Sequence, residues 1–285
     1  MILPGVNIIS RHNEQALHSG IDSYKCCNDK NHYRVYLYDV SYNYNSRGFR
    51  DHEWPGSLTD FKKTIWCVGD SFTSGIGSPF EHTWPQVLSK RLGQRTINVS
   101  LDGASNNWIA RQAKMILTEI APDIIIVHWS FSHRREKDIN EVLDPIWQNY
   151  YDAIKDPLWP DCKSYMYVNR LPDYVQKSLF QDPKSASWFN EFDVDSDRRL
   201  AFVDSTADED FTNTQDCINQ LGCDAGTKII HSFIPNWHVT NCSDKLNFNN
   251  QPVIPEFSHL DYARDGFHYD IKTSEYFVDQ LVSLI

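Results

Sequence analysis

The chain has 285 residues, of which 41% are hydrophobic and 13% aromatic, and its formal net charge is −11. A chain of this length can bury a sizeable core and is compatible with one large domain or with a domain that carries an insertion. The acidic balance, without a basic cluster, argues against nucleic acid and anionic membrane as main partners. No window reaches the ~18 consecutive apolar residues of a membrane span.

The N-terminal segment and the cysteines indicate a compartment. Residues 1–10 lack both the basic region and the long apolar stretch of a signal peptide, so we expect a cytoplasmic protein. The seven cysteines leave at least one thiol unpaired, and without an export signal we expect reduced thiols. None of these cysteines has zinc-ligand spacing, so we predict no metal site.

Two parts are predicted along the chain. Residues 1–60 form an N-terminal extension with one strand, Tyr33–Val40, and residues 61–285 form the main domain. The predicted elements of this domain are, in order, the strand Ile65–Val68, a helix over Trp84–Leu92 ending at Gly93, the strand Thr96–Val99, a helix over Asn107–Ile120, the strand Asp123–Val127, a helix over Phe211–Leu221, a last strand over Thr227–Phe233, and a C-terminal helix containing Tyr276, Phe277, Leu281 and Leu284. The alternation predicts an α/β fold, a three-layer α/β/α sandwich around a central parallel sheet.

An insertion at about residues 138–206 interrupts this alternation with aromatic-rich sequence and little periodicity. Its aromatic side chains either form a wall on which sugar rings stack or attach an irregular subdomain to the core, and the second interpretation is favoured. These residues are Trp147, Tyr150, Tyr151, Trp159, Tyr165, Tyr167 and Trp188.

The most informative segment is Gly69-Asp70-Ser71, directly after the predicted strand Ile65–Val68. A buried parallel strand delivers a nucleophile in this way to the loop at its carboxyl end. A serine hydroxyl needs a base within hydrogen-bond reach and a third group that orients the base. Asp265 and His268, three residues apart near the C-terminus, supply both groups. The alternative is that both motifs are turns, the first with an Asp or Ser cap.

These blocks resemble those of the SGNH (GDSL-type) hydrolase superfamily. The resemblance implies a flavodoxin-like fold with Ser71 as nucleophile, His268 as base and Asp265 as the acid that orients the base. No cofactor is implied.

Two further blocks extend the resemblance. Residues 98–105 look like the second block, which implies that the Gly103 N–H faces the oxyanion beside the Ser71 N–H. Residues 45–50, Asn-Ser-Arg-Gly-Phe-Arg, look like a stretch that precedes the first strand in many bacterial members. Arg50 is its last residue, and we expect it to pair with a carboxylate beneath the site, as a structural ion pair or a substrate contact.

The third block departs from the family pattern, which places an asparagine just after the third strand. Here the predicted strand Asp123–Val127 leads into His128, Trp129 and Ser130. Ser130 can donate to an oxyanion through its hydroxyl, and His128 or His133 through a ring N–H. Loss of one such donor typically lowers the rate by ~100-fold to 1000-fold.

Several neighbours of the motifs are further candidates. Asp70 either orients the nucleophile loop or serves only as a helix N-cap. His128 and Trp129 are candidate substrate contacts. Residues 134–136, Arg-Arg-Glu, either bind an anionic group or form a solvated salt-bridged face, and the second interpretation is favoured.

The function expected from the sequence is a serine esterase that removes an acyl group, with acetyl as the expected group, from a carbohydrate or related ester. The partner is thus a small-molecule or glycan ester. One alternative is an O-acyltransferase, because a sugar hydroxyl can resolve the same acyl-enzyme. Another is a catalytically weakened glycan-binding or structural SGNH-like module, including a component of a phage virion. The acyl group, the sugar and the oligomeric state stay open.

Overall fold

The centre of the molecule is a five-stranded parallel sheet. The computed structural model describes residues 20–22, 38–102, 104–132, 134–137, 166–168, 206–222, 226–234, 245–254, 259–264 and 268–285. The strands lie in the order β4 (Thr96–Ser100), β3 (Ile65–Gly69), β5 (Ile124–Trp129), β8 (Lys228–Phe233) and β9 (Val253–Ile254), and all neighbouring strands are parallel. Numbered along the chain, this is the 2-1-3-4-5 order of flavodoxin-like folds.

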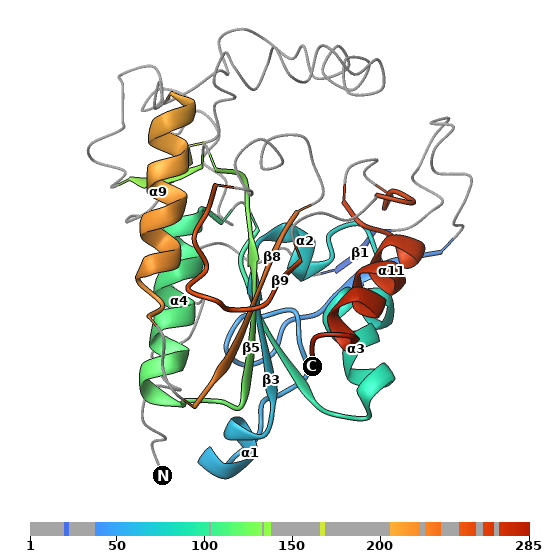
Figure 1. The fold of residues 1–285 in the computed structure, drawn as a ribbon. Helices are drawn as coiled ribbons and strands as arrows, with labels where there is room; N and C mark the ends of the chain where they lie inside the picture. Colours follow the sequence, from blue (N-terminus) through green and yellow to red (C-terminus); the bar gives the residue numbers. More distant parts are fainter. Residues whose placement is uncertain are drawn as a thin grey trace, which may run out of the picture.

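Helices cover both faces of this sheet (Figure 1). On one face lie α4 (Asn106–Glu119) and α9 (Ala207–Asn219), and on the other lie α3 (Trp84–Leu92) and α11 (Ile271–Val282). The predicted three-layer α/β/α sandwich is therefore confirmed.

Short elements complete the described part. These are the helices α1 (Leu58–Lys62), α2 (Ser71–Ser74) and η3 (Phe80–His82), the antiparallel pair β1 (Gly20–Asp22) and β2 (Val40–Tyr42), and the antiparallel pair β6 (Arg135–Lys137) and β7 (Met166–Val168). Among the described residues, no helix combines the length and apolar character that crossing a bilayer requires.

Two sequence predictions about strands need correction. The third strand continues to Trp129, so His128 and Trp129 belong to β5 and not to the loop after it. The segment Thr227–Phe233 is not the last strand, because the two-residue strand β9 pairs with β8 at the sheet edge. Of the predicted strand Tyr33–Val40, residues 33–37 lie outside the described residues, as does the insertion at 138–206 except for residues 166–168 and 206.

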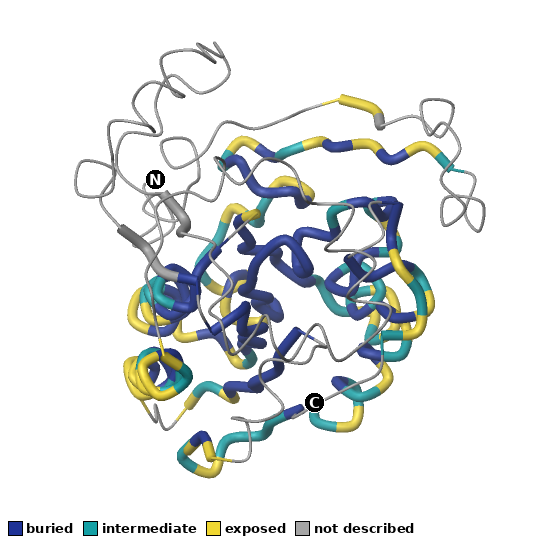
Figure 2. The backbone as a smooth tube through the Cα atoms, turned by 90° about the horizontal axis from the view of Figure 1, so that it is seen from above, coloured by how far each residue is buried: buried dark blue, intermediate teal, exposed yellow. Residues whose placement is uncertain are grey.

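The core divides into two layers because successive strand side chains point to opposite faces. On β3, Trp66 and Val68 pack under α4, whereas Ile65 and Cys67 pack under α3 and α11. Figure 2 shows the buried strands at the centre and the exposed residues on the outer sides of the helices. Phe49 and Trp54, which belong to the predicted N-terminal extension, pack into the core layer under α4. The boundary at residue 60 stays a prediction.

Candidate active site

The nucleophile loop is a tight turn from β3 into α2. Gly69 ends the strand, and a Cβ built there lies 2.1 Å from Thr73 Oγ1 and 3.1 Å from the His128 carbonyl oxygen, so only glycine fits. Asp70 is the N-cap of α2, and its Oδ1 accepts a hydrogen bond of 3.0 Å from the Phe72 N–H. Ser71 is the first residue of α2, a position whose N–H has no partner within a helix. The turn thus directs both the Ser71 hydroxyl and its N–H to the carboxyl edge of the sheet.

Two of the predicted site residues meet at this edge, although 197 positions separate them. His268 Nε2 lies 2.7 Å from Ser71 Oγ. Both residues are nearly enclosed, with exposed fractions of 8% and 2%. The Phe72 ring packs on the imidazole of His268 at 4.5 Å between centroids. A base in hydrogen-bond contact with a buried hydroxyl is the arrangement that activates a serine.

The backbone of His268 is held from several sides. Its carbonyl accepts hydrogen bonds from the Ala263 N–H at 2.8 Å and from His259 Nε2 at 3.3 Å. Because a carbonyl only accepts, His259 carries its proton on Nε2. Burial lowers the pKa of His259 to about 4. Ser78 Oγ donates to the carbonyl of the next residue, Tyr269, at 2.8 Å. These contacts fix the base relative to the nucleophile.

Three sequence-predicted residues lie outside the described residues: Asp265, Gly103 and His133. The orientation of His268 by Asp265 and the donation of the Gly103 N–H to an oxyanion therefore stay predictions.

The third block brings Ser130 to Asp70. Ser130 Oγ lies 2.5 Å from Asp70 Oδ2 and donates its proton to that carboxylate. Its backbone is fixed by Asn106 at the start of α4, which accepts from the Ser130 N–H at 2.8 Å and donates to the Ser130 carbonyl at 3.3 Å. The structure directs the hydroxyl to Asp70, and an oxyanion role for Ser130 stays a prediction.

The sequence interpretation of residues 134–136 as a solvated face is wrong for Arg134. Its exposed fraction is 6%, and Nη1 donates to Asp70 Oδ2 at 3.0 Å and to Ser130 Oγ at 2.9 Å. Its guanidinium also lies over the Phe131 ring, 4.6 Å from the centroid. Burial raises the pKa of the Asp70 carboxyl, while the charge of Arg134 and the hydrogen bond from Ser130 lower it. Sequence reasoning missed this residue as a neighbour of the nucleophile.

His128 and Trp129 do not face the site. His128 is fully buried on the α3 and α11 side of β5, where its Nδ1 lies 2.8 Å from Ser232 Oγ and its Nε2 lies 2.9 Å from the Tyr269 hydroxyl. Burial lowers its pKa to about 3, so it is neutral at pH 7. Trp129 is buried on the opposite face and donates to His231 Nδ1 at 3.0 Å. The predicted substrate contact through these two side chains is therefore wrong in this structure, because both belong to the core.

Arg50 binds backbone rather than the predicted carboxylate. Its Nη1 donates to the carbonyls of Ser74 and Gly75, and its Nη2 donates to those of Ser41 and Ser78 at 3.0 and 2.8 Å. The exposed fraction of Arg50 is 1%, so it supports the loop after α2 from within.

The residue after Arg50, Asp51, does form an ion pair, with Arg95. Asp51 accepts from both terminal nitrogens of Arg95 at 3.0 Å and from the Asn98 N–H at 3.1 Å. This pair ties the segment before β3 to β4.

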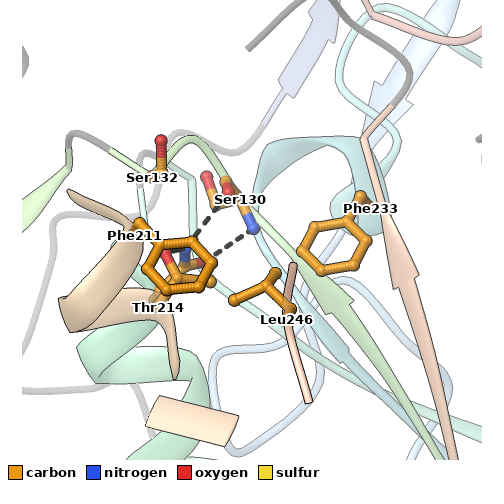
Figure 3. Close-up of a pocket in the computed structure, with 7 residues that line it drawn as sticks. Ser130, Ser132, Phe211, Thr214, Phe233 and Leu246 are labelled. Carbon is orange, nitrogen blue, oxygen red and sulfur yellow. Dashed lines mark hydrogen bonds between the residues drawn. The ribbon is translucent and has the colours of Figure 1, made fainter. Parts of the chain in front are cut away.

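A small pocket lies beside the Ser130 backbone, between α9 and the ends of β5 and β8 (Figure 3). Its walls are mostly apolar, formed by Phe211, Phe233 and Leu246. Neither Ser71 nor His268 lines it, so the pocket adjoins the site without containing the reactive atoms. Within the described ranges, no group of three or more His, Cys, Asp or Glu side chains is arranged to hold a metal ion.

Comparisons with known proteins return structural likenesses only. Neither a protein-family model nor a curated protein matches the sequence. The structure is similar to that of TesA, with 12% identity, 78% of this chain and 97% of that chain covered, and a TM-score of 0.45. It is also similar to a protein of the G-D-S-L family from Desulfitobacterium hafniense (12% identity, 78% and 99% covered, TM-score 0.37). A third is an acetyl xylan esterase from the rumen bacterium Butyrivibrio proteoclasticus (15% identity, 81% and 64% covered, TM-score 0.41). At these identities and TM-scores, the likenesses assign neither a family nor an activity to the chain.

Proposed function

We propose that the protein is a serine ester hydrolase of the SGNH type, with Ser71 as nucleophile and His268 as general base. The observation that carries the proposal is the 2.7 Å contact between His268 Nε2 and Ser71 Oγ at the carboxyl edge of the parallel sheet. This edge is where ligands bind in open α/β sheets.

In the first half of the reaction, Ser71 Oγ attacks the ester carbonyl carbon and its proton passes to His268 Nε2. The carbonyl oxygen becomes an oxyanion, which the Ser71 N–H and, by the family resemblance, the Gly103 N–H stabilise. The proton on His268 then passes to the leaving alcohol as the ester bond breaks. The products of this half are the free alcohol and an acyl group on Ser71.

In the second half, water takes the place of the alcohol. His268 removes a proton from the water as it attacks the acyl carbon, and returns that proton to Ser71 Oγ as the acid leaves. Asp265 is proposed to hold His268 in the tautomer that keeps Nε2 free to accept. None of these steps uses a cofactor.

The substrate proposed is a carbohydrate that carries an acyl group, with acetyl as the acyl group. The family resemblance and the aromatic residues of the segment 138–206 support it, because aromatic faces suit the apolar face of a sugar ring.

Turnover of p-nitrophenyl acetate and of an acetylated xylo-oligosaccharide tests the proposal. Ser71→Ala is expected to lower kcat/KM by roughly 10⁴-fold or more, since removal of the nucleophile ends covalent catalysis. Ser74→Ala is the matched control, because it removes another buried hydroxyl from the same short helix. Equal turnover by wild type and Ser71→Ala would contradict the proposal.

A second candidate, a glycan-binding module without turnover, is favoured by the contact of Ser130 with Asp70 at the position where the family carries its asparagine donor. It predicts that the acetylated oligosaccharide binds wild type and Ser71→Ala with equal affinity and that neither variant releases acetate.

A further inference from the structure

A buried cluster of three side chains adjoins the nucleophile: Asp70, Ser130 and Arg134. Asp70 directly precedes Ser71, Ser130 directly follows β5, and Arg134 lies four residues further along. The exposed fractions are 0% for Asp70, 0% for Ser130 and 6% for Arg134. A charge at this place is poorly screened by solvent.

The geometry concentrates donors on one carboxylate. Asp70 Oδ2 accepts from Ser130 Oγ at 2.5 Å and from Arg134 Nη1 at 3.0 Å, while Oδ1 accepts from the Phe72 N–H at 3.0 Å. Arg134 Nη1 also donates to Ser130 Oγ at 2.9 Å, so each of the three side chains contacts the other two. Asp70 thereby keeps the orientation in which it caps α2.

The charge of Asp70 acts on the reaction centre in two opposite ways. It attracts a proton on His268, an interaction that lowers the pKa of the Asp70 carboxyl. It also repels the negative oxygen that forms beside the Ser71 N–H when the ester carbonyl is attacked. A positive charge next to the Asp70 carboxylate offsets this repulsion. Arg134 is a cation in contact with that carboxylate.

We infer that Arg134 is a positioning residue for ester hydrolysis: through Asp70 and Ser130 it neutralises the carboxylate next to Ser71 and holds the Asp70 cap that aims the Ser71 N–H at the oxyanion. A guanidinium from the segment after β5 thus compensates electrostatically for the asparagine donor that the third block lacks. The inference rests on the proposed function, because it concerns the same reaction.

Three variants test this role by steady-state turnover of p-nitrophenyl acetate. Arg134→Met keeps an unbranched apolar side chain without the guanidinium charge, and we expect kcat to fall about 100-fold with KM changed less than about threefold. Arg134→Lys keeps the charge, and we expect kcat within about tenfold of wild type. The double variant Asp70→Asn/Arg134→Met removes both charges and keeps a helix cap, and we expect at least a tenfold higher kcat than in Arg134→Met.

The matched control is Arg91→Met, which removes the charge of an exposed arginine paired with Asp279 on the outside of α3 and α11. Its kcat is expected to equal that of wild type. Thermal melts of every variant give the folded fraction, so that kcat refers to folded protein.

The outcomes separate the inference from the proposed function. Wild type without turnover overturns the proposed function and the inference with it. Active wild type together with an Arg134→Met variant within threefold of it overturns the inference alone, and so does a double variant no faster than Arg134→Met. If Arg134→Met does not fold, the folded double variant decides: kcat within about 30-fold of wild type supports the inference, and a loss beyond that overturns it.

Discussion

Two buried arginines flank the short helix that carries the nucleophile, and they meet opposite ends of it. Arg50 donates to carbonyls at the C-terminal end of α2, including those of Ser74 and Gly75. Arg134 binds the carboxylate of Asp70, the N-cap of the same helix. The two arginines are almost equally buried, with exposed fractions of 1% and 6%.

The partners decide what each arginine does. The carbonyls around Arg50 are neutral, so its guanidinium completes the backbone hydrogen bonding of a loop. It also lies at the C-terminal end of α2, where a positive charge is favourable. The partner of Arg134 is an anion, so the pair is neutral as a unit. Loss of Arg50 is therefore expected to act on folding, whereas loss of Arg134 is expected to act on the charge beside Ser71.

The largest expected effect on stability comes from Arg50→Met. It removes the guanidinium donor from the buried carbonyls of Ser74, Gly75 and Ser78 and from the carbonyl of the exposed Ser41. We expect the free energy of unfolding to fall by ~3–5 kcal/mol, because each unsatisfied buried acceptor is costly. Urea unfolding measures the change. A loss below ~1 kcal/mol would show that water replaces the guanidinium. It would contradict the view that Arg50, unlike Arg134, acts mainly on folding.

The next largest expected effect is a loss of stability at acidic pH. It comes from buried histidines that are uncharged in the folded protein. Burial lowers the pKa of His231 to about 4 and that of His259 to about 4. The unfolded chain, with histidine pKa near ~6.5, binds these protons first, so stability is present above pH ~6.5 and is lost as pH falls toward ~4. Each histidine contributes up to ~3 kcal/mol. The buried carboxyls Asp51, Asp70 and Asp270 act in the opposite sense, because burial raises their pKa.

His231→Gln isolates one of these contributions, because it leaves the three carboxyls unchanged. Gln accepts from the Trp129 indole in place of Nδ1 but does not titrate. Between pH 6 and pH 5, the slope of unfolding free energy against pH should decrease by ~1 kcal/mol per pH unit relative to wild type. An unchanged slope in urea unfolding at both pH values would indicate that His231 is protonated in the folded protein.

A smaller effect on stability is expected from Tyr269→Phe, at the residue after the base His268. The substitution removes only the hydroxyl that lies 2.9 Å from His128 Nε2. The free energy of unfolding should fall by ~1–2 kcal/mol, since one buried hydrogen bond is lost. Arg91→Met, an exposed pair, should change it by less than ~1 kcal/mol in the same urea titration. Equal losses in the two variants would contradict the importance assigned to burial.

The α/β alternation along the chain and most helices could be predicted from the sequence because their signals are local. The apolar run Ile65–Val68, for example, has the continuous burial of a central parallel strand. The strand β9 gave no such signal, because it is two residues long and its pairing with β8 depends on tertiary contacts. The end of β5 was placed too early because His128 and Trp129 read as polar or amphipathic, although both are buried.

The parts of the site that lie in sequence motifs could be predicted. The parts formed by contacts between residues far apart in the sequence could not. Ser71 and His268 come from recognisable blocks, and the structure brings them together. Arg134 stands next to Arg135 and Glu136, a charged run that is typical of a solvated surface. Only the fold shows that Asp70, 64 positions earlier, lies within hydrogen-bond reach of Arg134. Arg50 was misjudged for the same reason, since its partners are backbone carbonyls that a sequence does not display.

The measurement that tests the central claim most directly is fluorophosphonate labelling of the folded protein, followed by mass-spectrometric mapping of the adduct. An activated serine reacts with this probe, so we predict one adduct on the peptide that contains Ser71. The adduct should be absent in Ser71→Ala and at least ~100-fold slower to form in His268→Gln, which lacks the base. No adduct in folded wild type, or an adduct on another residue, would contradict the assignment of Ser71 and His268 as nucleophile and base.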